Sequence, residues 1–182
     1  MVVPRSRDRR HVETSIYRML ASVLVAASLA FRGPVLQSRL LRTSAIVMGR
    51  KPGVAAPEEL TTFVASAGAN LIVLDVRNPD FSLEPGDAKS NEKAPIADCG
   101  NSRKCALNVV YDRGSDSMDL GSIPSQLIEA GGGKEKVPVI THCGGGGRGQ
   151  KAKDFLLANG FGNVMNGGGP EDDECWATFG DK

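Results

Sequence analysis

Histidine is scarce in this 182-residue sequence, which contains only His11 and His142. The four cysteines are also too far apart for the usual pairs of zinc ligands. They lie at positions 99, 105, 143 and 175, and five residues separate even the nearest two. We therefore expect no metal site in this protein.

The sequence also has no apolar run long enough to cross a membrane. The stretch Met19–Ala30 is twelve residues long, whereas a transmembrane helix needs about twenty apolar residues. Five arginines precede this run, and Ser28 and Ala30 supply small residues at the −3 and −1 positions of a cleavage site. These features are typical of a signal-peptide core, although a buried core helix could have the same composition.

Acidic residues are nearly absent from the same part of the chain. Residues 1–53 hold ten Lys/Arg and two acids, a formal charge of +8, whereas residues 54–182 hold twelve Lys/Arg and nineteen acids, or −7. We therefore predict a cleavable leader over 1–53, with a signal-like core at 19–30 and a transit-like segment at 31–53. A domain over 54–182 would follow it.

This leader resembles the bipartite plastid-targeting leader of algae with secondary plastids, so a plastid location is favoured. The mitochondrion and the secretory pathway are the alternatives. The positive charge lies in the part expected to be removed and has no aromatic residues interleaved with it. We therefore expect no nucleic-acid partner, and no membrane partner for the mature protein.

The most informative stretch is Val137–Gly149. Its apolar start, Val139–Ile140, predicts a buried strand that delivers Cys143 to a loop of four glycines closed by Arg148. An amphipathic pattern over 150–159 predicts a helix directly after this loop.

This order of strand, cysteine, glycine loop and helix predicts an anion-binding cup. Glycine allows positive φ angles, so that successive N–H groups can turn inward, and the helix N-terminus adds partial positive charge. A Cys143 thiolate would be stabilised there as a nucleophile. The predicted anion-binding residues are Gly144, Gly145, Gly146, Gly147, Arg148 and Gly149. A lone cysteine at a strand end is otherwise a small buried apolar residue, but this unbroken succession favours function.

The loop resembles the active-site loop of the rhodanese family, and three more segments fit that family in order. Leu71–Arg77 resembles its early strand ending in Asp-Val-Arg, Ala106–Val110 its next strand, and Phe161–Gly169 the strand and turn after the active-site helix. The resemblance covers about residues 56–180. It implies an α/β fold with a rhodanese-like central, mainly parallel sheet flanked by helices.

The resemblance also implies a thiosulfate or persulfide sulfurtransferase. The Cys143 thiolate would take sulfane sulfur from thiosulfate or a persulfide donor and pass it to a thiol or cyanide acceptor. No metal or organic cofactor is expected; the partners would be small sulfur anions and a thiol or protein acceptor. The Cys-x4-Arg spacing to Arg148 matches sulfurtransferases, whereas related phosphatases have one more residue. Phosphatase or arsenate reductase chemistry is less favoured, and a non-catalytic persulfide carrier or a redox or sulfide sensor remains open.

Other polar residues are assigned supporting roles. Asp75 and Arg77 would lie at the carboxyl edge of the sheet, where ligands bind, and the resemblance favours a structural ion pair near the site. Because side chains alternate along a strand, His142 should face away from Cys143, which favours a core or supporting role over a general base. The remaining cysteines are expected to be free thiols, one of which could resolve a persulfide.

The rest of the domain is predicted to consist of short helices and loops. Helices are expected over 57–66, 123–130 and 171–179. Residues 78–104 are polar and turn-rich and lack the histidine motif that the family has there, so an irregular segment is expected. The polar stretch 111–121 is expected to be a loop.

Overall fold

The computed structural model describes residues 50–97 and 103–182. These residues form an α/β fold around a four-stranded parallel sheet with strand order β2-β1-β5-β6. The strands are β1 (Ile72–Asp75), β2 (Ala106–Asn108), β5 (Val139–His142) and β6 (Val164–Asn166). The predicted fold class is thus confirmed. Most of the predicted leader lies outside the described residues, as does Cys99.

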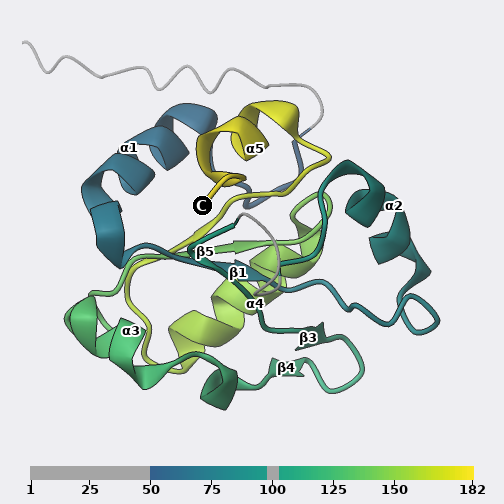
Figure 1. Ribbon diagram of the computed structural model, residues 1–182. Helices are drawn as coiled ribbons and strands as arrows, with labels where there is room; N and C mark the ends of the chain where they lie inside the picture. Colours follow the sequence, from purple (N-terminus) through teal and green to yellow (C-terminus); the bar gives the residue numbers. More distant parts are fainter. Residues whose placement is uncertain (1–49, 98–102) are drawn as a thin grey trace, which may run out of the picture. The chain divides into compact units, whose positions relative to one another are not determined.

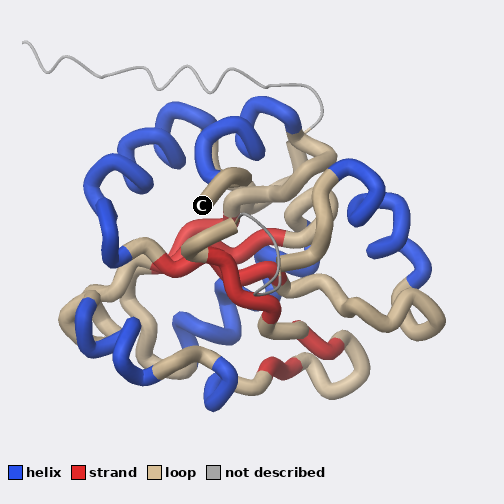
Figure 2. Tube along the Cα trace, in the orientation of Figure 1, coloured by secondary structure: helices blue, strands red, loops and turns tan. Residues whose placement is uncertain are grey.

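Helices cover both faces of this sheet (Figures 1 and 2). One face packs against α1 and α5, and the other against α4. The helices are α1 (Pro57–Ala67), α2 (Pro85–Lys93), α3 (Ser125–Ala130), α4 (Gly147–Ala158) and α5 (Asp173–Phe179). Within the described residues, no helix has both the length and the apolar character needed to cross a bilayer.

Helix α1 forms where the sequence predicts it. Pro57 occupies the first turn, where its missing N–H costs no hydrogen bond, and Glu58 and Glu59 face the positive end of the helix dipole. The helix ends at Gly68, which has a φ of +54°. Its buried side chains, Leu60 and Phe63 among them, pack in one cluster with α5.

The central strands β1 and β5 pair in a register that decides where the site residues lie. Asp75 is opposite His142, and Val73 is opposite Ile140. Side chains alternate between faces, so His142 faces the side covered by α1 and α5. Cys143, the next residue, belongs to the cluster on the opposite face.

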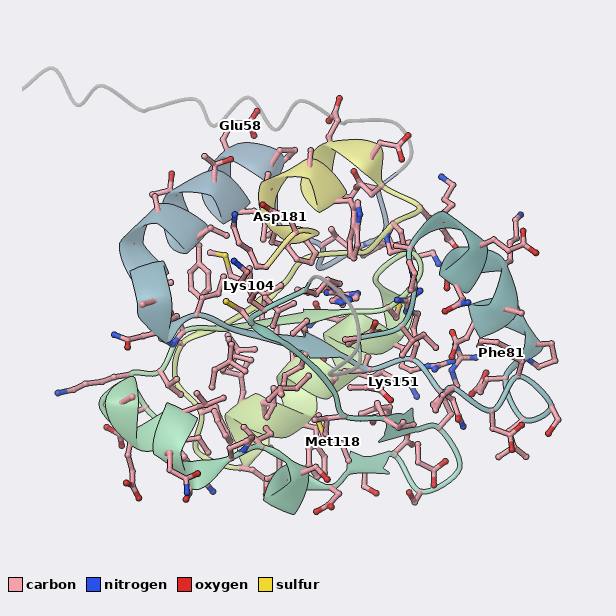
Figure 3. All side chains as sticks on the ribbon, viewed as in Figure 1. Glu58, Phe81, Lys104, Met118, Lys151 and Asp181 are labelled. Atoms are coloured by element: carbon pink, nitrogen blue, oxygen red, sulfur yellow. The ribbon has the colours of Figure 1, made fainter. Side chains whose placement is uncertain are left out.

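Two segments expected to be irregular contain regular structure. Residues 78–104 include α2, which begins at Pro85 and buries Asp87 and Ser90. Residues 111–121 include a small antiparallel pair, β3 (Tyr111–Asp112) and β4 (Ser117–Met118). The buried side chains of Tyr111 and Met118 join the α4 side of the core, where Figure 3 labels Met118. In both segments tertiary contacts outweigh a polar local sequence.

The helix after the glycine loop begins earlier than the sequence predicts. Helix α4 starts at Gly147 rather than at Gln150, so Gly147, Arg148 and Gly149 are helical. The loop that follows Cys143 is therefore only Gly144–Gly146.

The predicted helix 171–179, by contrast, starts two residues later than expected, at Asp173. There the Asp172 side chain accepts a hydrogen bond from the Cys175 N–H and caps the helix.

Candidate active site

Cys143 lies directly after β5, at the carboxyl edge of the sheet. Its N–H donates to the carbonyl of Gly168 at 3.0 Å, which fixes the main chain at this point. The Gly146 N–H points at the sulfur, with an N···Sγ distance of 3.2 Å. The side chain is only 6% exposed and touches the aliphatic core on one side.

The other side of the sulfur borders a pocket of about 510 Å³. The glycines that line it are Gly86 on α2, Gly144 and Gly145 in the loop, and Gly147 at the start of α4. The charged residues that line it are Lys51, Arg113, Arg148 and Lys151, with Glu84, Asp87 and Glu171. The structure thus brings Cys143, Gly144, Gly145, Gly147 and Arg148 to one cavity, where charges of both signs meet.

Gly146 gives the loop its shape. Its φ of +90° is left-handed and caps α4. The side chain of Asn166, at the end of β6, donates to the Gly146 carbonyl at 3.0 Å. A Cβ at Gly146 would collide with Cγ2 of Val54, so both conformation and space require glycine here.

Most of the other glycines of this stretch also have no space for a side chain. A Cβ on Gly144 would lie 2.7 Å from Glu171 Oε1, and one on Gly145 would lie 2.5 Å from Glu171 Oε2. Gly149, inside α4, is pressed against Asn166, whose Oδ1 would be 2.7 Å from a Cβ. Gly147 is the exception, since its nearest neighbour would be Lys51 Cδ at 3.9 Å. The glycines at 144, 145 and 149 therefore make room for neighbouring chain segments.

The guanidinium of Arg148 is held by two carboxylates. Nη1 lies 2.6 Å from Asp87 Oδ2, and Nη2 lies 3.0 Å from Glu84 Oε2. Nη1 also donates to the Val76 carbonyl at 3.4 Å. The residue lines the pocket but is only 3% exposed. Its contact with a substrate anion stays a prediction, and the geometry gives it a second task, attaching α2 to α4.

Asp75 and Arg77 form the ion pair that the sequence suggests. Arg77 donates from Nη2 to Asp75 Oδ2 at 2.6 Å and from Nε to Oδ1 at 2.9 Å, with both side chains fully buried. Arg77 also binds the carbonyls of Ala94 and Pro95, at 3.0 and 3.2 Å. The pair thereby attaches the end of α2 to β1.

The pKa of Asp75 reflects these contacts. Burial alone would raise it, but the charge of the His142 ring when it is protonated, the Arg77 guanidinium and the N–H of Ala97 stabilise the carboxylate and hold the pKa below its usual range. Arg103 Nη1 adds a further ion pair at 3.2 Å. The carboxylate therefore stays ionised at neutral pH.

His142 is a buried supporting residue. Arg103 Nη2 lies 2.7 Å from its Nε2, and a guanidinium can only donate, so Nε2 is an acceptor. The proton is then on Nδ1, which donates to the Cys143 carbonyl at 3.3 Å. Burial lowers the pKa of His142 to about 4, and the positive charges of Arg103 and Arg77 also oppose protonation of the ring. Its ring packs on Trp176 and Phe179, away from the sulfur.

The other described cysteines lie on the opposite face of the sheet from Cys143. Cys105 and Cys175 pack with the cluster that contains α1 and α5. Burial raises the pKa of the Cys175 thiol to about 12, and the neighbouring Asp172 adds to this effect. Neither thiol is positioned to resolve a persulfide on Cys143 without rearrangement of the sheet, and Cys99 lies outside the described residues.

Sequence reasoning missed the acidic side of the site. Glu84 and Asp87 come from the segment interpreted as irregular, although Pro85 followed by Asp87 is a helix-start signal that could have indicated α2. Asn166 could have been suspected because it ends a strand at the carboxyl edge. Nothing local indicates Glu171, which reaches the loop through the tertiary fold.

The predicted leader boundary cuts through contacts with the domain. Arg50 Nε lies 3.0 Å from Asp172 Oδ2, its Nη2 lies 3.4 Å from Glu174 Oε2, and Lys51 lines the pocket. Cleavage after residue 53 would remove these contacts, and the boundary itself stays a prediction. In residues 50–97 and 103–182, no three His, Cys, Asp or Glu side chains are grouped to bind a metal ion.

Comparison with known proteins leaves the function open. No family model and no curated protein matches the sequence. A solved structure titled as the atomic-resolution structure of an uncharacterized protein from Saccharomyces cerevisiae is similar to 70% of this chain and 93% of its own, with 20% identity and a TM-score of 0.39. Likeness at this level carries no argument about function.

Proposed function

We propose that this protein is a sulfurtransferase that carries sulfane sulfur on Cys143. The observation that carries the proposal is the placement of this sulfur: it meets the Gly146 N–H at 3.2 Å, borders a pocket, and immediately precedes the loop that leads into α4. A main-chain N–H and a helix N-terminus both stabilise a thiolate and the anions that react with it. The family resemblance supplies the reaction class.

The reaction proceeds in two balanced steps. The Cys143 thiolate attacks the outer sulfur of thiosulfate, a sulfur–sulfur bond forms, and sulfite leaves with the electron pair of the broken bond. A thiolate or cyanide then attacks the outer sulfur of the Cys143 persulfide, and the electron pair of that bond returns to Sγ. The enzyme alternates between thiolate and persulfide, so ping-pong kinetics are expected.

The residues around the sulfur have distinct tasks in this scheme. Gly146 supplies the N–H that faces the reacting sulfur, and Asn166 holds Gly146 in place. Arg148 keeps α2 against the pocket and is the predicted ligand for a leaving anion. His142 supports Cys143 through the main-chain carbonyl and takes no proton from the sulfur.

A sulfur-transfer assay with thiosulfate and cyanide tests the proposal. Mass spectrometry after incubation with thiosulfate alone should find one added sulfur atom on Cys143. The Cys143→Ser variant should lose both the adduct and the turnover. Cys105→Ser is the matched control, because Cys105 is half-buried on the opposite face and should leave both unchanged. Undiminished turnover in Cys143→Ser would refute the proposal.

A persulfide carrier is the second candidate, and one observation favours it. The site is not a purely cationic anion cup, since Glu84 and Asp87 neutralise Arg148 and Glu171 lines the same pocket, where its charge opposes the binding of a dianion such as thiosulfate. A stable Cys143 persulfide formed from other donors, with negligible thiosulfate turnover, would identify a carrier. Hydrolysis of an aryl phosphate would instead indicate phosphatase chemistry.

A further inference from the structure

Most charges in the pocket are already paired within the protein. Arg148 is bound by Asp87 and Glu84 at 2.6 and 3.0 Å. Glu84 also lies 3.5 Å from Arg113, and Lys151 lies 2.8 Å from Asp116. These six paired residues therefore carry little net charge that could attract a substrate.

Lys51 and Glu171 are different, because neither has an ion-pair partner within the described part of the chain. Their charged atoms lie over the same loop residue: a Cβ on Gly145 would be 2.5 Å from Glu171 Oε2 and 3.0 Å from Lys51 Nζ. These charged groups are still more than 4.0 Å apart, too far for a direct ion pair. One positive and one negative group therefore flank the loop with a gap between them.

Main-chain hydrogen bonds hold the backbone of both residues beside the loop. The Glu171 N–H donates to the Gly144 carbonyl at 2.9 Å, which ties this residue to the loop after the nucleophile. The Val54 N–H donates to the Lys51 carbonyl at 3.2 Å, and the preceding residue, Arg50, binds Asp172. Glycine at 144 and 145 leaves the space that the Glu171 carboxylate occupies.

We infer that Lys51 and Glu171 form a subsite for a zwitterionic amino-acid thiol, which accepts sulfur from Cys143. Glu171 binds the ammonium group of this acceptor, and Lys51 binds its carboxylate. The inference rests on the proposed function, whose acceptor class it names, and it requires that any leader is cleaved before Lys51. A zwitterion matches a pair of opposite charges, whereas a simple anion would meet repulsion from Glu171.

The transfer step needs no further reagent. The acceptor thiolate attacks the outer sulfur of the Cys143 persulfide, a new sulfur–sulfur bond forms, and the old one breaks. Its electron pair returns to Sγ as a thiolate, and the acceptor leaves as a persulfide. The pocket volume of about 510 Å³ lies within the usual range for small-ligand sites.

The test measures single-turnover sulfur transfer from the full chain carrying a Cys143 persulfide. The persulfide is formed with inorganic polysulfide, and its amount is determined by mass spectrometry before an acceptor is added. Three acceptors are used: L-cysteine, N-acetyl-L-cysteine without an ammonium group, and cysteamine without a carboxylate. Because these thiols differ in reactivity, each acceptor is compared only between protein variants.

Each variant should affect only the acceptors that carry the matching group. Glu171→Gln should slow transfer to L-cysteine and cysteamine by roughly three- to tenfold and leave N-acetyl-L-cysteine within about twofold. Lys51→Met should slow L-cysteine and N-acetyl-L-cysteine similarly and spare cysteamine. Glu58→Gln and Lys89→Met are matched controls, because both residues are exposed and neither lines the pocket.

Two outcomes would overturn the subsite, and they are distinguishable. A normal persulfide whose transfer changes equally for all three acceptors, or for none, would remove the subsite and leave the sulfurtransferase proposal intact. A wild-type protein that forms no persulfide on Cys143 would remove both.

Discussion

Replacing Arg148 by methionine is expected to be among the most damaging single changes outside the apolar core. The substitution keeps most of the side-chain volume but removes the guanidinium that lies 2.6 Å from Asp87 and 3.0 Å from Glu84. Asp87 is only 5% exposed and cannot turn into water. Its remaining partner is the Asn78 N–H, at 2.7 Å, which cannot compensate a full charge.

The magnitude follows from the burial of this pair. Removing one partner of a buried ion pair costs about 3–5 kcal/mol, because the other charge stays desolvated. Domains of this kind have a free energy of unfolding of about 5–15 kcal/mol, so Arg148→Met should remove about a fifth or more of it. We expect α2 to detach first, since Arg148 is one of the few links between this helix and α4.

Urea denaturation of the full chain measures this effect. Adding Asp87→Asn to Arg148→Met should recover at least about 1 kcal/mol, because it neutralises the stranded carboxylate. Lys151→Met is the control on the same helix: its exposed pair with Asp116 should contribute little. If Arg148→Met costs less than about 1 kcal/mol, or if the double variant is no more stable than the single one, the reasoning about this pair is wrong.

Two further predictions concern the loop and the buried histidine. Gly146→Ala should destabilise the protein by about 2–4 kcal/mol, because the left-handed φ and the collision with Val54 both disfavour a side chain there. Gly147→Ala should be neutral or should stabilise the protein by up to about 1 kcal/mol, because the position is helical and open. Thermal unfolding of both variants measures this difference. Burial lowers the pKa of His142 to about 4 in the folded protein, so this residue takes up a proton more readily when the chain is unfolded. The free energy of unfolding should therefore fall by about 2–4 kcal/mol as the pH drops from about 6.5 to 4. In denaturation curves, His142→Gln should reduce this dependence on pH, and an unchanged dependence would refute the assignment.

The sequence predicts the central strands and α1 well because local signals and tertiary packing agree there. The runs at 71–74 and 139–140 are apolar on both faces, as is typical of strands in a covered parallel sheet. Pro57 in the first turn and Gly68 directly after the last residue are the usual sequence signals for the start and the end of a helix. All four residues of β1 and all four of β5 are buried.

The acidic half of the site could not be predicted from local pattern. Helix α2 has almost no apolar face, and what it buries are the polar side chains of Asp87 and Ser90. These side chains are stable in the interior only because Arg148 and Arg77 meet them there. Such pairing across 61 residues of sequence has no periodicity to detect. The early start of α4 has a similar origin, since Gly149 is a poor helix former that packing against Asn166, at the end of β6, holds in place.

The alternation of β5 separates the chemistry of the site from its support. His142 and Cys143 are adjacent in sequence but face opposite sides of the sheet, so His142 acts on Cys143 only through the main-chain carbonyl at 3.3 Å. Protonating His142 should therefore reduce the stability of the fold without supplying or removing a proton at the sulfur. A pH dependence of sulfur transfer measured above about pH 6.5 must then originate in the acceptor or in the pocket, and not in His142. Among the described residues the Gly146 N–H faces the sulfur, at 3.2 Å, and Lys51 and Glu171 line the same pocket.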